Sequence, residues 1–226
     1  MPRTRKELAV VLLSSGMDSA VCASFASQTH DLALLHFQYG QRSAKKELEC
    51  FYKLVEFFKP VVYKVVELPF LKEFGGSSLT SSEIEIPPED KPGEIPSTYV
   101  PFRNGIFLSV AAAWAEVLGA KRIFIGANEV DYSGYPDCRG EFLKTLEQAI
   151  NLGTKPETQI TIEAPLLRLT KAEIVKLGIK LGTPFQLTWS CYREGEVACG
   201  NCASCKLRLK AFKEAGVEDP ISYEGF

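Results

Sequence analysis

Short apolar runs alternate with helical periodicity in the first half of the chain. Residues 8–13 and 32–37 are nearly continuous apolar runs, and residues 61–66 are rich in valine, as is typical of strands in a covered sheet. An alanine-rich stretch reaching about residue 27 favours a helix, and apolar residues recur at helical spacing over residues 43–58. The pattern therefore predicts two strand–helix pairs followed by a third strand.

The second half continues this alternation. Residues 104–118 are apolar around most of a helix circumference, which predicts a helix between two layers. A strand is predicted at 122–126, a helix at 141–151, a short strand at 160–163, and a helix that opens at Thr170 with a capping-box pattern. Because strands that alternate with helices imply right-handed crossovers, we expect an α/β fold: a parallel, Rossmann-like sheet with helices on both faces.

Residues 72–98 interrupt the alternation. They contain a glycine pair, several acidic residues and four prolines, Pro87, Pro88, Pro92 and Pro96. A long segment without regular structure inside a compact domain is usually functional or disordered. Two interpretations stay open: a lid over a substrate site, and a solvated insertion.

Composition limits the classes of partner. The chain has 226 residues, is 46% hydrophobic and carries a net charge of −2, so nothing indicates an electrostatic footprint for nucleic acid. The apolar run at residues 8–13 is far shorter than the ~20 residues that cross a bilayer. No signal-peptide pattern follows the basic N-terminus. We expect a soluble cytoplasmic protein without membrane association.

The first predicted strand runs directly into a turn of small polar residues and then a helix. Glycine allows a tight turn there, and N–H groups at a helix N-terminus face an anion. The candidate phosphate ligands are Ser14, Ser15, Gly16, Met17, Asp18 and Ser19. The alternative is a plain strand-to-helix turn in which Asp18 caps the helix. The segment is not a Walker A loop, because the G-x-x-x-x-G-K-[ST] pattern does not occur.

Four of the seven cysteines crowd into fifteen residues near the C-terminus: Cys191, Cys199, Cys202 and Cys205. Four thiolates satisfy tetrahedral Zn²⁺ without leaving an open position, so this spacing predicts a structural zinc site. Disulfides fit a reducing cytosol poorly. Cys199, Cys202 and Cys205 resemble part of a ferredoxin iron–sulfur motif, but no fourth cysteine followed by proline stands at the required distance after them. Chance clustering of buried thiols is unlikely at this density.

Two resemblances follow from these motifs. Residues 14–19 resemble the SGGxDS loop of the N-type ATP pyrophosphatases, although Ser15 stands where that pattern usually has its first glycine. Nearly the whole chain resembles the 7-cyano-7-deazaguanine synthase family. The matching stretches are Tyr39-Gly-Gln-Arg42, Val100-Pro-Phe-Arg-Asn104, Asp131 to Arg139, Thr188-Trp-Ser-Cys-Tyr192, Cys199 to Cys205 and Asp219-Pro-Ile-Ser-Tyr223.

The resemblance implies a fold, an assembly and a reaction. The fold is that of the adenine-nucleotide α-hydrolases over residues 1–187, with a zinc lobe at residues 188–226, as one compact unit in a homodimer. The reaction turns 7-carboxy-7-deazaguanine and ammonia into the nitrile, with ATP and Mg²⁺. The implied chemistry is adenylation of the carboxylate, formation of an amide and a second activation that leaves the nitrile.

Such a reaction needs particular side chains. Positive groups must stabilise the leaving pyrophosphate, and Arg103, Arg139 and Lys171 are the candidates, with Asp18 beside the phosphates. Aromatic and carboxylate groups suit a deazaguanine; these are Tyr132 and Tyr135 for stacking, and Asp131 or Asp137 for its N–H groups. Structural roles stay open for each: a turn at residues 132–136, an ion pair for Arg103, and an exposed first-turn position for Lys171.

Two other functions remain as alternatives. A tRNA-thiolating enzyme uses a similar ATP loop and needs a reactive cysteine, for which Cys22 or Cys138 is available, but the near-neutral charge argues against tRNA as a partner. A zinc-ribbon binding module is the second, with Lys206, Arg208 and Lys210 as a small basic face. That module leaves the α/β body unexplained.

Overall fold

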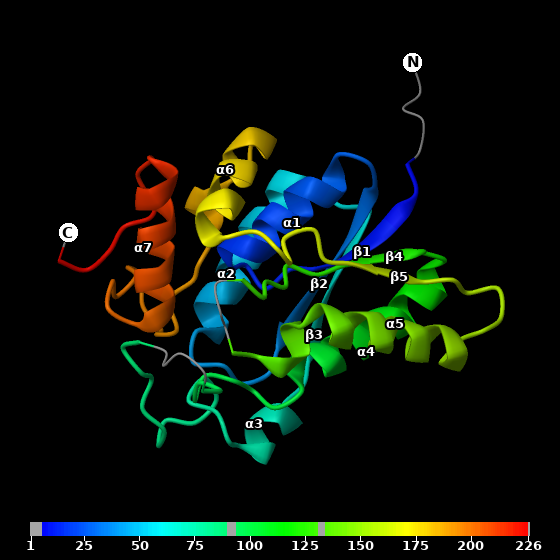
Figure 1. The fold of residues 1–226 in the computed structure, drawn as a ribbon, viewed down its shortest axis with the longest axis horizontal. Coiled ribbons are helices and arrows are strands. Elements are labelled where there is room, and N and C mark those ends of the chain that lie inside the picture. Colours follow the sequence, from blue (N-terminus) through cyan, green and yellow to red (C-terminus); the bar gives the residue numbers. More distant parts are fainter. Residues whose placement is uncertain (1–5, 90–93, 131–133, 226) are drawn as a thin grey trace.

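The computed structural model describes residues 6–89, 94–130 and 134–225, so the candidate residues Asp131 and Tyr132 lie outside the described chain. Its strands form one parallel sheet in the order β3-β2-β1-β4-β5 (Figure 1). The strands are β1 (Leu8–Leu12), β2 (Asp31–Gln38), β3 (Val62–Glu67), β4 (Arg122–Phe124) and β5 (Thr161–Glu163).

Helices cover both faces of this sheet, with α1 and α6 on one face and α4 and α5 on the other (Figure 1). The helices are α1 (Met17–Ser27), α2 (Ala44–Phe58), α3 (Phe70–Phe74), α4 (Arg103–Leu118), α5 (Gly140–Gly153), α6 (Lys171–Leu181) and α7 (Ala203–Ala215), with 3₁₀ turns η1 (Pro136–Cys138) and η2 (Phe185–Leu187). The expected α/β fold with a parallel sheet is therefore confirmed.

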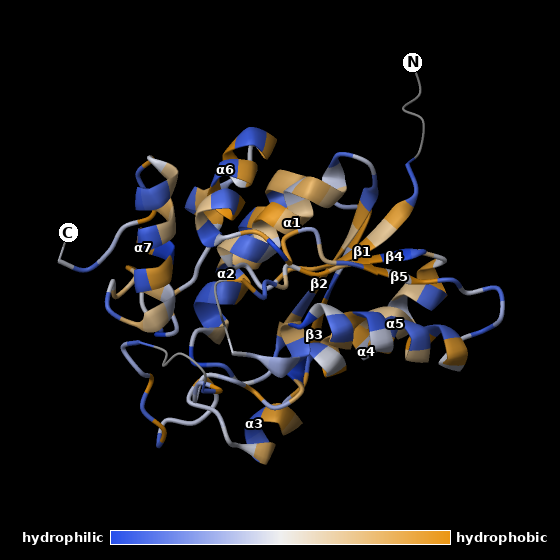
Figure 2. Cartoon of the chain, in the orientation of Figure 1, coloured by the Kyte–Doolittle hydropathy of each residue, from blue (hydrophilic) through white to orange (hydrophobic). Residues whose placement is uncertain are grey.

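The central strand β1 shows why its sequence is apolar without a break. Successive side chains of a strand point to opposite faces, so both sets in β1 are buried. Val10 and Leu12 pack in the core formed with α4 and α5, whereas Ala9 and Val11 pack in the core formed with α1, α2 and α6. Figure 2 shows the result: the central strands are largely hydrophobic and the helices carry polar residues on their outer faces.

The strand order places the site. The chain reaches the edge of the sheet at β3 and returns to the middle, where β4 pairs with β1 on the side opposite β2. The connections that leave β1 and β4 therefore diverge, and a crevice opens at the carboxyl ends of these two strands. The loop at residues 14–19 follows β1 directly and lies in this crevice.

The segment at residues 72–98 is neither wholly solvated nor wholly without regular structure. It begins inside α3, and its next residues are packed rather than solvated, since Ser77, Ser78 and Thr98 are fully buried. Arg42 holds it by donating hydrogen bonds to the carbonyl oxygens of Ser81 (2.5 Å) and Ile84 (2.7 Å). A plain solvated insertion is therefore wrong for residues 77–80 and Thr98, whereas most described residues between 82 and 97 are exposed, and closure as a lid stays a prediction.

The C-terminal residues continue the core of the body. Helix α7 contacts α6, and the rings of Phe185 and Phe212 meet edge to face at 5.1 Å. The division at residues 187 and 188 stays a prediction. Among the described residues, none of the helices combines the length and apolar character needed to cross a membrane.

Candidate active site

The loop that follows β1 contains a serine, Ser15, at the position where the related loops usually have glycine. Ser15 has φ 71°, in the left-handed region that glycine usually occupies. Two hydrogen bonds hold it there: its Oγ donates to the Glu47 carbonyl oxygen (2.8 Å), and its own carbonyl oxygen accepts from the Trp189 N–H (2.9 Å). The serine therefore takes the glycine's geometry and is fixed in it by α2 and by the chain before the cysteine cluster.

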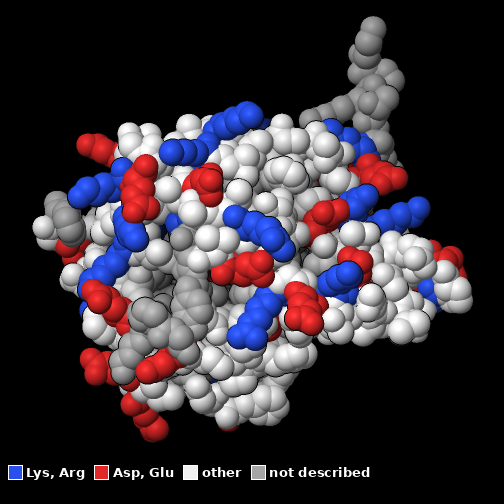
Figure 3. All heavy atoms as spheres, viewed as in Figure 1, with Lys and Arg blue, Asp and Glu red and all other residues white. Residues whose placement is uncertain are grey.

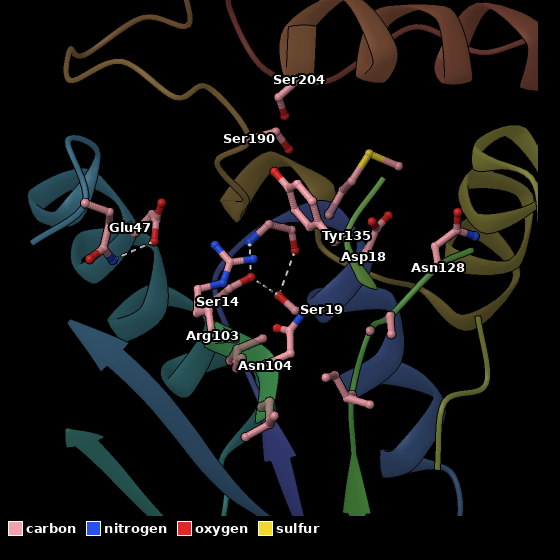
Figure 4. Close-up of a pocket in the computed structure, with 18 of the residues that line it drawn as sticks. Ser14, Asp18, Ser19, Glu47, Arg103, Asn104, Asn128, Tyr135, Ser190 and Ser204 are labelled. Atoms are coloured by element: carbon pink, nitrogen blue, oxygen red, sulfur yellow. Dashed lines mark hydrogen bonds between the residues drawn. The ribbon is translucent and has the colours of Figure 1, made fainter. Parts of the chain in front are cut away.

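The hydroxyl groups of the loop converge at the start of α1 (Figure 4). Ser14 Oγ and Ser19 Oγ are 3.2 Å apart, and Ser19 Oγ also donates to the Gly16 carbonyl oxygen (3.0 Å). Helix α1 starts after Gly16 without a hydrogen bond from a capping side chain, so the alternative role of Asp18 as a cap is wrong. Hydroxyls and first-turn N–H groups are what an anion such as phosphate needs.

Asp18 pairs instead with a residue from the far end of the chain. Its Oδ2 accepts a hydrogen bond from Lys171 Nζ, and the Lys171 side chain is only 16% exposed, so it is not a free surface lysine. The capping box of Thr170 and Glu173 fixes the start of α6 and thus the position of Lys171. The other carboxylate oxygen, Asp18 Oδ1, is buried without a hydrogen-bond partner.

Close packing between β4 and α1 shapes the floor of the crevice. A Cβ atom on Gly126 would lie 3.0 Å from the backbone of Asp18 and Ser19, so only glycine fits at this position. Beyond it, Asn128 lines the crevice and donates hydrogen bonds to the carbonyl oxygens of Leu166 (3.1 Å) and Leu169. These contacts fix the end of β4 against both α1 and the start of α6.

An aromatic wall holds a buried cation opposite the loop. The Arg103 guanidinium lies over the rings of Tyr39 (5.6 Å), Tyr135 (5.8 Å) and Phe107 (5.9 Å), and its Nη1 donates to Tyr39 Oη (2.9 Å). Burial lowers the pKa of Arg103, but the charges of neighbouring Tyr39, Tyr135 and Asp137 raise it by more. The net pKa is above the usual arginine value, so the guanidinium stays charged. Burial raises the pKa of Tyr39 to about 12.

Two predicted site residues lie away from this cavity. Asp137 is 2% exposed, and its carboxylate accepts hydrogen bonds from the backbone N–H (2.7 Å) and side-chain amide (3.2 Å) of Asn104. Burial raises the pKa of Asp137, and these hydrogen bonds oppose the rise. Arg139 is exposed, precedes α5 and does not line the cavity. In this structure Asp137 therefore orients Asn104, and direct substrate contacts by Asp137 and Arg139 stay predictions.

The phosphate loop, Lys171, Asn128 and the Arg103 aromatic wall surround one cavity of about 310 Å³. Its lining also contains groups that the sequence alone did not mark as site residues: Gln41, Ser43, Glu47, Asn104, Asn128, Trp189, Ser190, Tyr192, Ser204 and Arg208. Figure 4 shows Arg103, Ser14 and Ser19 converging at its centre, with Glu47 reaching in from α2. Several of these residues, including Gln41 and Trp189, belong to the family motifs quoted above. Membership in those motifs was the sequence signal that could have identified them as site residues.

Arg208 connects the cavity to the C-terminal residues. It is 1% exposed and pairs with Asp219 through Nε (2.7 Å) and Nη2 (2.9 Å), while Nη1 donates to Thr188 Oγ1 (2.7 Å). Asp219 Oδ2 also accepts from Tyr223 Oη (2.6 Å). The motifs at 188–192 and 219–223 thus meet at one guanidinium. The suggested basic face at 206–210 is wrong for Arg208, which points inward.

The cysteine cluster fits the predicted metal. The sulfur atoms of Cys191, Cys199, Cys202 and Cys205 are all buried and lie within 4.8 Å of one another. Tetrahedral Zn²⁺ with bonds of ~2.3 Å places sulfurs ~3.8 Å apart. The Cys199 and Cys205 sulfurs are 4.0 Å apart, about twice a disulfide length. Four converging thiols without a fifth ligand position suit a closed structural site, not a catalytic one.

The two cysteines considered for sulfur transfer differ in position. Cys22 is fully buried in the α1 core, where burial raises the pKa of its thiol, so it is unsuited to attack a substrate. Cys138 lines the cavity, and the Asn104 amide donates to its sulfur (3.2 Å). On the face seen in Figure 3, acidic and basic side chains intermingle, and the drawn residues form no broad region of one sign.

Comparison with known proteins agrees with the site. Residues 8–216 match the family described as Queuosine biosynthesis protein QueC. A 7-cyano-7-deazaguanine synthase from a Nitratiruptor species is 51% identical over 217 residues, covering 96% of this chain and 98% of that protein. One from Oceanobacillus iheyensis is 50% identical over 216 residues, covering 95% and 97%.

The fold is also shared with a distant solved structure. A predicted subunit of tRNA methyltransferase from Methanocaldococcus jannaschii superposes with a TM-score of 0.50 at 15% identity, covering 96% of this chain and 92% of that one. At this identity the likeness concerns the fold alone. The full-length match to the family and the identity of about half the residues to curated enzymes decide the assignment: the chain belongs to the QueC family of queuosine biosynthesis proteins, a family of enzymes.

Proposed function

We propose that this enzyme converts 7-carboxy-7-deazaguanine and ammonia into 7-cyano-7-deazaguanine with consumption of ATP. The observation that carries the proposal is the single cavity in which an anion-binding loop, the Asp18–Lys171 pair and the Arg103 aromatic wall meet. Relatives that are about 50% identical over nearly the whole chain are named 7-cyano-7-deazaguanine synthases.

The loop at residues 14–19 holds the phosphates of ATP in this proposal. The hydroxyls of Ser14 and Ser19 and the first-turn N–H groups of α1 donate to phosphate oxygens. Lys171 lies beside them and stabilises the charge that develops as the substrate carboxylate attacks the α-phosphate and pyrophosphate leaves. The product of this step is an acyl-adenylate, which is a far better electrophile than the carboxylate.

Magnesium fits the same place. Asp18 Oδ1 is a buried carboxylate oxygen without a hydrogen-bond partner, and hard cations such as Mg²⁺ take oxygen ligands from one or two carboxylates and from phosphates. When bound, the ion neutralises charge on the phosphates. Lys171 contributes a second positive group at Asp18 Oδ2, so that the carboxylate stays in place when phosphates bind.

Ammonia completes the chemistry. It attacks the acyl-adenylate carbon, AMP leaves, and an amide forms. The amide oxygen is then activated by a second ATP-dependent step, and loss of that oxygen with the nitrogen-bound protons gives the nitrile. Arg103 stays charged on the opposite wall and is placed to stabilise negative charge on the reacting carboxyl oxygens.

Zinc has a structural role in this proposal. The four thiols converge on each other and use no ligand from the cavity, while Trp189 and Ser190, which precede Cys191, line the cavity wall. The metal would therefore hold the wall in place. We also propose a homodimer, from the family resemblance, and no stable nucleic-acid binding, from the near-neutral charge. Light scattering and a gel shift with bulk tRNA test these two points.

Mass spectrometry tests the function directly. Purified protein is incubated with Mg-ATP, ammonium and 7-carboxy-7-deazaguanine. The nitrile should appear together with AMP and pyrophosphate, and an incubation without ammonium should yield no nitrile. A zinc-replete protein that binds ATP but leaves the acid unchanged would refute the substrate assignment while leaving the fold assignment intact.

A further inference from the structure

Two groups in the cavity lining have hydrogen-bonding capacity that the described residues leave unused. Trp189 is 6% exposed and lines the cavity, yet its indole Nε1–H has no hydrogen-bond acceptor. A buried donor without a partner costs free energy, so such a group in a cavity lining indicates that a ligand supplies the acceptor. The backbone of Trp189 is fixed, because its N–H donates to the Ser15 carbonyl oxygen (2.9 Å).

Glu47 is the second group, and it is half-buried and already accepts hydrogen bonds at both oxygens. Its Oε1 accepts from Ser43 Oγ (2.5 Å) and its Oε2 from Gln41 Nε2 (3.0 Å), which fixes the carboxylate at the edge of the cavity. Among the described residues, no lysine, arginine or histidine forms an ion pair with it, unlike Asp18, which has Lys171. Each carboxylate oxygen has capacity for a further donor.

Ser15 brings these two residues together. Its Oγ donates to the carbonyl oxygen of Glu47 (2.8 Å), and its carbonyl oxygen accepts from Trp189. One residue of the loop therefore bonds α2 on one side and the chain before the cysteine cluster on the other. Glu47 and Trp189 both line the cavity, together with Ser14 and Gly16 on either side of Ser15.

We propose that Glu47 and Trp189 recognise the guanine-type edge of the substrate base, with Glu47 accepting from its ring N–H and exocyclic amine and Trp189 donating to its carbonyl oxygen. This inference rests on the proposed function and names the residues that determine its specificity. It also differs from the expected recognition by Asp131 or Asp137: the Asp137 carboxylate accepts hydrogen bonds from Asn104, and Asp131 lies outside the described residues.

The donor and acceptor pattern distinguishes this base from the adenine of ATP. A 7-deazaguanine presents two donors next to one carbonyl acceptor along one edge. A carboxylate next to an indole N–H presents two acceptors next to one donor, which is the complement. Adenine presents a single donor and a ring-nitrogen acceptor there, so it leaves a carboxylate oxygen facing an acceptor. A site that pairs with buried polar groups rejects a ligand that cannot match them.

This arrangement also orients the reacting group. On the base, the carbonyl oxygen lies between the ring N–H and the 7-carboxylate along the perimeter. A base held by its donors at Glu47 and by its carbonyl at Trp189 therefore points its carboxylate away from Glu47. In this proposal the carboxylate faces the phosphate loop and Arg103, which line the same cavity.

Binding of 7-carboxy-7-deazaguanine without ATP or ammonium, followed by calorimetry, tests recognition separately from catalysis. Glu47→Gln removes one acceptor and should weaken binding about 10- to 100-fold. Trp189→Phe keeps the ring beside Lys46 Nζ (5.5 Å) but removes the donor, and should weaken binding about fivefold. Glu56→Gln, an exposed position on α2, is the matched control and should bind as the native protein does.

A base analogue without the exocyclic amine sharpens the test. The native protein should bind this analogue at least about tenfold more weakly than the full base, whereas Glu47→Gln should lose most of that difference. In turnover, Glu47→Gln should raise KM for the base and leave KM for ATP and ammonium within about twofold. Circular dichroism and thermal unfolding establish that each variant is folded.

Three results would overturn the proposal. The first is native affinity for the base in both Glu47→Gln and Trp189→Phe. The second is an equal penalty for the missing amine in native protein and Glu47→Gln. The third is a change in KM for ammonium alone, which would make Glu47 an ammonia site. If the native protein binds the base in the predicted pattern but does not convert it, recognition stands and the proposed function fails.

Discussion

In the cysteine cluster, four buried sulfur atoms lie within 4.8 Å of one another, an arrangement that suits a single metal ion. In the loop at residues 14–19, Asp18 Oδ1 is buried without a partner and Ser15 holds a left-handed backbone. The two regions are neighbours, because Trp189, two residues before Cys191, is bonded to Ser15. In the proposed function, the cluster holds structure around one metal ion, whereas the unpaired polar groups of the loop meet substrate and Mg²⁺.

Loss of the cluster should have the largest effect. Cys202→Ser should abolish zinc binding and lower the melting temperature by about 10 °C or more, because binding free energy at a structural zinc site is folding free energy. Metal analysis and calorimetry measure this. Cys50→Ala is the matched control, since Cys50 packs against the cluster but is not one of the four converging thiols. Normal stability in zinc-free Cys202→Ser would contradict the structural role.

The link between the two regions should come next. Arg208→Ala leaves Asp219 buried without its cation, which should lower the free energy of unfolding by about 3–5 kcal/mol. Denaturant titration measures the loss. Lys210→Ala, an exposed position two residues further on, should change the free energy by less than about 0.5 kcal/mol. Equal effects of the two substitutions would show that the Arg208 network does not join the regions.

Removing the cation of the phosphate loop should affect catalysis without affecting the cluster. Lys171→Ala should lower kcat/KM about 10²- to 10³-fold, because a preorganised charge at the leaving pyrophosphate is lost. Zinc content should stay native. Steady-state kinetics and metal analysis report both quantities, and Lys176→Ala on the same helix is the control. A rate within about threefold of native would remove Lys171 from the mechanism.

The smallest expected effect isolates the loop's backbone. Ser15→Ala keeps φ 71° and loses the hydrogen bond to Glu47, whereas Ser15→Gly loses the same bond but relieves the left-handed conformation. Ser15→Gly should therefore be more stable than Ser15→Ala by about 1 kcal/mol. Matched denaturant titrations measure the difference. Equal stability would mean that the conformation at Ser15 carries no strain.

Sequence patterns predicted the parts of the molecule that depend on local spacing. The strands at β1 and β2 and the helices α2 and α4 follow from burial on two faces or on one stripe, which the sequence displays directly. The capping box at Thr170 and the four cysteines are also local patterns, and the structure confirms the box and brings the four sulfurs together.

Relations between distant residues needed the tertiary structure. Lys171 reaches Asp18 across most of the chain, and Arg208 turns inward to Asp219 although its neighbours suggested a basic face. The sequence displayed Gln41, Glu47 and Trp189 as residues of a motif or a helix, without showing that they share a wall. The strand order brings them together, because it is set by packing many apolar surfaces at once and not by any single segment.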